Sequence, residues 1–223
     1  MKTLPAFFQR AGRRPLLALV AALCSAGPPA ALGFTVDITP GSRALFLQVG
    51  AGTVTGGNFN SGGTPGSNTT VNSASVTVPS AQIGSGAGQT MTTDSTLTAS
   101  AWDGRAFCTS PASTGQVYVG GFFRRPGNGS GGSDAMLSVS TPAALINADG
   151  ATLAFSNVAW TSSGNGDSTP TLPSGAFTGG AQTLLTVTRN TWFESCLAFR
   201  YLNTQLVPAG TFTGRATFTL STP

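Results

Sequence analysis

The stretch Gly210 to Ser221 near the end of the chain constrains the fold more than any other segment. Its apolar or small residues alternate with threonines, an arginine and a serine. The apolar or small positions are Phe212, Gly214, Ala216, Phe218 and Leu220. A period of two indicates a strand with one buried and one exposed face. The run from Pro208 to Ala216 that leads into it has a near copy from Pro173 to Ala181, so the chain repeats a glycine turn followed by a threonine-rich strand.

Further apolar runs lie between turns rich in glycine, proline and asparagine, and they predict about ten to twelve short strands. Residues 44–49 are apolar on nearly both faces and predict a central strand. Residues 116–124 predict a long strand, in which Gly120-Gly121 suggests a bulge or a bend. Residues 71–78 predict a strand with three apolar residues on one face: Ala74, Val76 and Val78. Only 142–147 suggests a helical turn. We therefore predict an all-β sandwich, Ig-like or jelly-roll.

The first 33 residues have the composition of a cleavable export signal. A basic start precedes a short apolar run from Leu16 to Ala26, and small residues end the segment. We predict a signal peptide over 1–33 and a single mature domain over 34–223, placed in the periplasm, at the cell surface or outside the cell. The apolar run is too short to span a membrane. The Arg13-Arg14 pair leaves twin-arginine export open beside the general route.

Much of the positive charge of the chain resides in this predicted signal. The whole sequence has 11 basic and 7 acidic residues, a formal net charge of +4. Four of the basic residues precede position 34, so seven arginines accompany seven acids in the mature chain. Nucleic-acid binding requires a basic surface, and we therefore predict no nucleic-acid partner.

The residue types missing from the mature chain argue against an enzyme. The sequence contains no histidine, and its single lysine is Lys2. Serine and cysteine nucleophiles need a neighbouring base, usually histidine or lysine. We therefore predict an exported non-enzymatic structural or surface protein that acts through protein interactions.

Two cysteines follow the predicted signal, Cys108 and Cys196. In an oxidising compartment an isolated pair of cysteines usually forms a disulfide. The alternative is two buried free thiols. We predict a Cys108–Cys196 disulfide.

The alternative function is carbohydrate binding or weak glycan hydrolysis. Glycosidases use two carboxyl groups about 5–10 Å apart, and exposed tryptophans can stack on sugars. A Cys108–Cys196 disulfide would bring two aromatic and acidic pairs together, because each pair lies close to one cysteine. The candidate binding residues are Trp102, Asp103, Trp192 and Glu194. In the structural alternative the tryptophans pack on the disulfide, Asp103 serves a turn and Glu194 pairs with an arginine.

Three loops resemble fragments of calcium loops: 129–134, 147–150 and 164–167. Each supplies one aspartate, whereas calcium takes six to eight oxygen ligands. Zinc lacks its usual ligands when histidine is absent and the cysteines are paired. We predict ordinary turns at all three loops, with no metal and no cofactor.

The closing strand also carries a resemblance. Gly210 stands fourteen residues from the end and is followed by alternating apolar positions, which resembles bacterial fimbrial and coat-type subunits. More broadly, the chain looks like secreted β-sandwich proteins of Gram-negative bacteria. The fimbrial resemblance implies assembly with copies of itself or with other surface subunits by strand addition, with the terminal segments 34–39 and 210–221 as the pairing strands.

Overall fold

The structure is a computed structural model that describes residues 36–51, 54–55, 64–65, 71–97, 99–100, 115–127, 134–164 and 171–222. Every described residue belongs to one compact unit, Ala31–Pro223. The predicted signal peptide therefore lies outside the described residues. Within the described ranges, no helix combines the length and the apolar character needed to cross a membrane.

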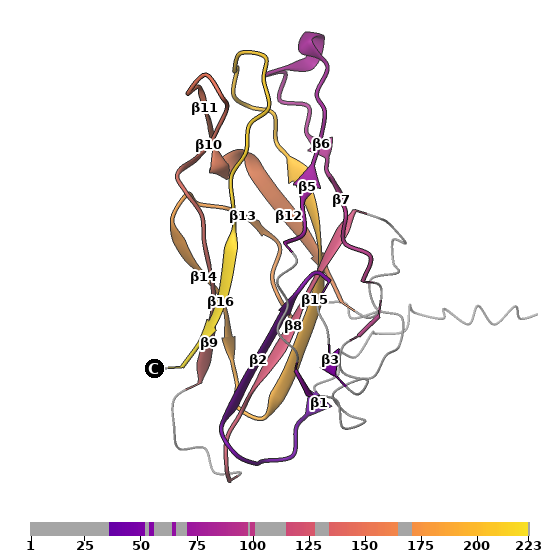
Figure 1. Ribbon diagram of the computed structural model, residues 1–223, viewed down its shortest axis with the longest axis vertical. Helices are drawn as coiled ribbons and strands as arrows, with labels where there is room; N and C mark the ends of the chain where they lie inside the picture. The colour runs from indigo at the N-terminus through magenta and orange to yellow at the C-terminus, as the bar shows by residue number, and fades with distance from the viewer. Residues whose placement is uncertain are drawn as a thin grey trace, which may run out of the picture. The chain divides into compact units, whose positions relative to one another are not determined.

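Two antiparallel sheets pack face to face in this unit (Figure 1). The larger sheet contains β1 (Val36–Asp37), β2 (Ala44–Val49), β6 (Gln89–Thr90), β8 (Gln116–Arg124), β12 (Val158–Ser163), β13 (Gly175–Ala176) and β15 (Thr191–Tyr201). Its order is β13-β12-β15-β8-β2, with β1 and β6 also paired to β15. The smaller sheet contains β9 (Ala135–Ser140), β14 (Ala181–Val187) and β16 (Thr217–Ser221), in the order β14-β9-β16. The predicted all-β sandwich is confirmed.

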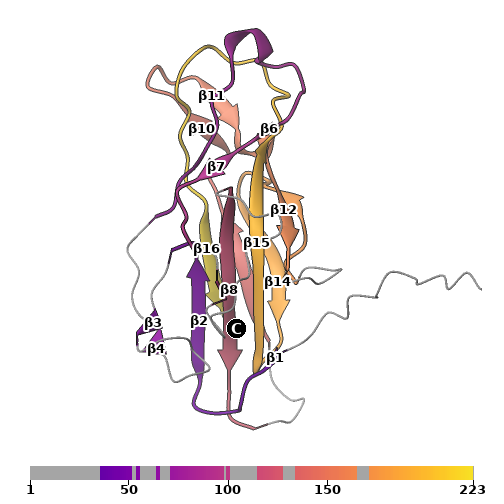
Figure 2. The same cartoon turned by 90° about the vertical axis from the view of Figure 1, so that its right-hand side faces the viewer.

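Shorter elements complete the described part of the chain, and several gather at one end of the sandwich (Figure 2). Three two-stranded ladders are β3 (Val54–Thr55) with β4 (Thr64–Pro65), β5 (Ala74–Ser75) with β7 (Thr92–Thr93), and β10 (Ala144–Ile146) with β11 (Thr152–Ala154). Two single-turn 3-10 helices are η2 (Ser80–Gln82) and η3 (Phe155–Asn157). The strands are more numerous and shorter than predicted, because some predicted strands pair over only two or three residues.

The main core lies between the two sheets and follows from alternation along β8. Val117, Val119 and Phe123 belong to a cluster that includes Leu137 and Val139 of β9. Each of these five side chains is 0–6% exposed. Successive side chains of a strand point to opposite faces, so the intervening residues of β8 lie on the other face of the larger sheet.

That other face carries a second cluster, which we call the outer cluster. Its buried members are Ile38, Phe46, Tyr118, Phe122, Trp192 and Cys196. Because of it, every residue of β8 from Gln116 to Phe123 is buried. The prediction that 44–49 forms the central strand is wrong, because β2 lies at the edge and β8 lies between β2 and β15.

The double glycine in β8 does not form a bulge, so that prediction is also wrong. Gly120 and Gly121 each pair in register with one residue of β2 and one of β15. The glycines are needed for space instead. A Cβ atom on Gly120 would stand 2.4 Å from the hydroxyl oxygen of Tyr118, whose ring lies over the bare glycine, as aromatic residues often do beside glycine in sheets.

The predicted helical turn at 142–147 is wrong as well. Residues 144–146 form β10, which pairs with β11 in a hairpin. Asn147 follows β10, and its side-chain oxygen accepts hydrogen bonds from the amides of Asp149 (3.1 Å) and Ala151 (2.7 Å). This is an Asx turn, in which the Asn147 side-chain oxygen is occupied by amides of its own loop.

The closing stretch behaves as a strand over only part of its predicted length. Residues 217–221 form β16 along β9, and Thr213 makes a single bridge to Ile146. Half-buried Ala216, Phe218 and Leu220 alternate with exposed neighbours. The predicted period of two is confirmed there, although the residues from 207 to 212 belong to no strand.

Candidate functional site

The structure places only part of the predicted binding set. Trp102 and Asp103 lie outside the described residues, and so does Cys108. Trp192 and Glu194 are on β15, two residues apart, and therefore share the outer face of the larger sheet. The structure thus gives no distance between the two acidic residues of the glycan hypothesis.

Trp192 is a buried ring of the outer cluster. It is 5% exposed, and its centroid lies 5.8 Å from Phe46 and 5.9 Å from Phe122. The Phe46 ring is stacked on it with an interplanar angle of 22°. A tryptophan that binds sugar needs an accessible face, whereas aromatic contacts of this kind stabilise a core. The geometry of Trp192 therefore favours the structural alternative.

Glu194 is the acceptor in a small polar cluster. One carboxylate oxygen, Oε2, accepts hydrogen bonds from the hydroxyls of Ser100 and Tyr118, each at 2.7 Å. Ser100 is 2% exposed and Tyr118 is 0% exposed. Hydrogen bonds to a charged acceptor are stronger than hydrogen bonds between neutral groups. The cluster therefore connects Tyr118 of β8 and Glu194 of β15 to Ser100.

The sequence reasoning missed Ser100 and Tyr118 as partners of Glu194. One local signal was present for Tyr118, since it stands two residues before a glycine and can cover it. No local signal marked Ser100, which is 94 residues from Glu194 along the chain.

An apolar groove lies elsewhere, along one edge of the sandwich, and we call it the edge groove. One wall is the edge segment, residues 71–79. The other is the closing segment, residues 207–218. Residues of the edge segment alternate between exposed and half-buried without interruption. Ala74, Val76 and Val78 are on the half-buried side and line the groove, as the sequence predicted for one face of a strand.

The edge groove comprises two neighbouring hollows of about 550 and 470 Å³. These volumes are typical of sites that bind ligands. Both hollows are lined by the same four apolar residues: Ala74, Met91, Leu145 and Val158. Phe155, Phe177 and Phe199 form part of the floor of the larger hollow, so a ligand there would contact the main core.

Neither wall of the groove is fully paired within a sheet. The edge segment pairs with β7 only through Ala74 and Ser75, and residues 76–79 belong to no strand. In the closing segment, residues 207–212 and 214–216 are likewise outside the strands. Extended edges whose peptide groups lack a partner strand favour the addition of another strand.

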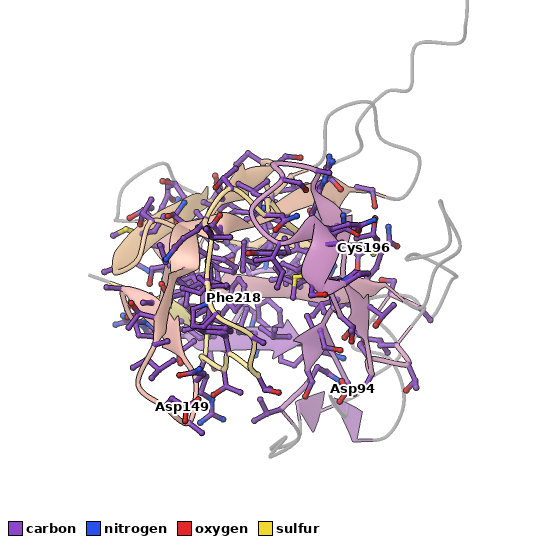
Figure 3. All side chains as sticks on the ribbon, turned by 90° about the horizontal axis from the view of Figure 1, so that it is seen from above. Asp94, Asp149, Cys196 and Phe218 are labelled. Atoms are coloured by element: carbon purple, nitrogen blue, oxygen red, sulfur yellow. The ribbon has the colours of Figure 1, made fainter. Side chains whose placement is uncertain are left out.

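A hydrogen-bonded clasp holds the start of the edge segment. The Asp94 carboxylate accepts from the Ser73 amide at 2.8 Å and from the Asn72 side chain at 3.0 Å. Asn72 in turn accepts from the Ala51 amide at 2.7 Å. Figure 3 labels Asp94, which anchors one wall, and Phe218, which lies in the other. The clasp therefore sets the position of the edge segment.

The clasp predicts an acid-sensitive edge segment. The Asn72 side chain, and after it the Ser73 amide, lower the pKa of Asp94 from its ordinary value of 3.8. A carboxyl group with a lowered folded pKa stabilises the fold fully above its unfolded pKa, and the stabilisation disappears as the pH falls through the folded pKa. We expect protection of the Ser73 amide from hydrogen exchange, corrected for intrinsic rates, to fall below about pH 3.8.

The matched variants for this titration are Asp94→Asn and Asp149→Asn. Asp149 is exposed in a turn remote from the clasp in sequence, so its variant should keep the acid step in Ser73 protection. Asp94→Asn should lack it. An identical acid step in both variants would show that another group controls the edge segment.

The outer cluster and the edge groove are thus the two candidate sites within the described residues. The first is a filled structural cluster, and the second is an open apolar groove whose walls are only partly paired. No family model, no curated protein and no solved structure matches the chain.

Proposed function

We propose that this protein is an exported, non-enzymatic structural or surface protein that acts by binding another polypeptide at the edge groove. The observation that carries the proposal is the combination in one place of an apolar lining and two walls that are only partly paired within sheets. Strand addition gives a partner both main-chain hydrogen bonds and pockets for alternate side chains. The predicted signal peptide and the resemblance to fimbrial subunits agree with such a role.

Site-specific photocrosslinking in cells that export the protein tests this function. A photoreactive amino acid at Val78, which lines the groove, should give discrete higher-mass adducts that contain a second polypeptide. The same group at Thr219, an exposed position on β16 that lines neither hollow, should not. Equal adducts at both positions, or none at Val78, would contradict the proposal.

The Cys108–Cys196 disulfide is part of the same proposal. Cys196 is 1% exposed within the outer cluster, and Cys108 lies outside the described residues. Export to an oxidising compartment would favour the disulfide.

Peptide mapping of the exported protein under non-reducing conditions should find one species that joins the peptides of Cys108 and Cys196. Reduction before digestion should separate the two peptides and serves as the control. Recovery of both cysteines as alkylated free thiols from the unreduced protein would rule the disulfide out.

A further inference from the structure

The terminal strands of the mature chain are already used within the fold. β1 pairs with β15, and Ile38, which follows it, is 4% exposed and donates its amide to the carbonyl of Asn190 at 2.7 Å. All five residues of β16 pair with β9. Either strand would have to give up these contacts before it could enter the groove of another copy. The occupant is therefore better sought in a different polypeptide.

The open part of the edge segment defines how long the added strand can be. β5 ends at Ser75, and residues 76–78 continue in the same alternating pattern without a partner strand. Pro79 follows and has no amide proton to donate, so a hydrogen-bonded ladder ends there. The carbonyl of Pro79 already accepts the amide of Gln82 at 2.8 Å. A short ladder along 76–78 is the expected backbone contact.

The lining determines the side chains of the occupant. Val76 and Val78 present apolar surface to the groove, and Met91, Leu145 and Val158 lie behind them. A strand added along this wall points every second side chain inward. Apolar side chains at every second position of the occupant would bury apolar surface against this lining and are favoured by about 25 cal/mol per Å² of that surface.

Arg215 determines the charge of the occupant. It is exposed on the closing segment, and among the described residues it is the one charged side chain that lines either hollow. Within the described part of the chain, Arg215 makes no hydrogen bond or ion pair. A guanidinium at the rim of an apolar groove favours a carboxylate next to the apolar side chains.

We infer that the edge groove binds an extended segment of a partner polypeptide that is apolar at every second position and carries an acidic side chain opposite Arg215. This inference rests on the proposed function, because it names the partner chemistry of the same groove. This mode of binding differs from self-assembly by strand exchange, because β1 and β16 stay paired within their own sandwich.

Fluorescence anisotropy with synthetic peptides tests the inference on the exported, purified protein. The probe is a labelled octapeptide of alternating valine and threonine in which one threonine is replaced by aspartate. Its control has the same composition with the four valines contiguous. The alternating peptide should bind saturably and the contiguous peptide at least about tenfold more weakly, because only the first can place its valines on one face.

Protein variants locate the binding. Val76→Lys and, independently, Val78→Lys should weaken the alternating peptide by about tenfold or more, because each places an ammonium group in the apolar wall. Thr219→Lys adds the same charge outside the groove and should leave the affinity unchanged. Thermal unfolding of each variant shows that the fold persists. Equal binding of the peptide by Val76→Lys, Val78→Lys and the wild type would overturn the inference.

A charge swap tests the role of Arg215. Arg215→Glu should weaken the aspartate peptide by about threefold and strengthen a version with lysine in place of aspartate, as expected for an exposed ion pair. Saturable binding of dodecanoate with no binding of either peptide would identify the groove as a site for an anionic amphiphile and would also overturn the inference.

The two proposals fail separately. Groove-specific adducts in cells together with no preference for the alternating peptide would leave the proposed function standing and remove the inferred partner chemistry. Preferential binding of the alternating peptide without groove-specific adducts in cells would contradict the proposed function and support the inferred partner chemistry.

Discussion

Gly121→Ala is expected to lower the free energy of unfolding by about 3 kcal/mol, because the new methyl group would overlap the backbone of β2. A Cβ atom on Gly121 would stand 2.1 Å from the carbonyl oxygen of Phe46 and 3.2 Å from the Cα atom of Leu47. These atoms belong to a paired strand and cannot rotate away as a side-chain tip could. β8 lies between β2 and β15, so any shift strains both ladders.

Urea unfolding followed by circular dichroism measures this effect. The matched control is Gly41→Ala, for which the atoms nearest to the new Cβ belong to the Arg124 side chain, at 3.4 Å or more. Its stability should stay within about 0.5 kcal/mol of wild type. If Gly121→Ala and Gly41→Ala unfold at the same urea concentration, β2 does not approach Gly121 as closely as the structure indicates.

Asn203→Ala is expected to cost about 3 kcal/mol, because several hydrogen bonds of one buried side chain are lost at once. Asn203 is 0% exposed, and its side-chain oxygen accepts the Gly84 amide at 2.8 Å. Its side-chain nitrogen donates to the Gln82 carbonyl at 2.7 Å, to the Ser85 hydroxyl at 3.0 Å and to the Ala87 carbonyl at 3.3 Å. The side chain therefore holds the loop that follows the edge segment.

The backbone of Asn203 adds a second cost that a further variant separates. Its φ angle is 58°, a left-handed conformation that asparagine and glycine tolerate better than alanine. Asn203→Gly should therefore be less damaging than Asn203→Ala, by up to about 1 kcal/mol. Leu206 lies three residues after Asn203 and is 81% exposed in wild type. Leu206→Ala should therefore change the free energy of unfolding by less than about 0.5 kcal/mol. Equal stability of Asn203→Ala and Leu206→Ala in urea unfolding would contradict the assigned role.

Much of the strand pattern could be predicted from the sequence, because it depends on neighbours along the chain. The predicted strands 44–49 and 116–124 agree with β2 and β8. The inward face of Ala74, Val76 and Val78 was also predicted correctly. Alternation reports which face of a strand is buried, and it needs no knowledge of what covers that face.

Predictions failed where a distant segment decides the outcome. Gly120-Gly121 suggested a bulge, yet the glycines make room for the Tyr118 ring and for β2. Residues 142–147 suggested a helical turn, yet pairing with β11 makes 144–146 a strand. Local propensity is a weak determinant when a partner strand supplies hydrogen bonds.

The candidate sites likewise combine features that the sequence predicted with features that only the structure shows. The sequence indicated Trp192 and Glu194 as candidate binding residues. Because both lie on β15, their shared face follows from their spacing. The sequence could not show that Phe46 and Phe122 bury the ring, or that Ser100 and Tyr118 hold the carboxylate. These partners come from other strands or loops, and contacts between them depend on sheet order.

The sequence by itself therefore determined that the stretch 210–221 alternates, that the chain is all-β, and that Ala74, Val76 and Val78 share one face. Only the tertiary structure decided that 207–216 leaves its sheet and faces 71–79 across an apolar groove. The physical reason is that a period of two is a property of one strand, whereas a groove is the space between two. The width and lining of that space depend on strand order and on contacts such as Asp94 with Ser73 and Asn203 with Gly84, which join residues far apart in the chain.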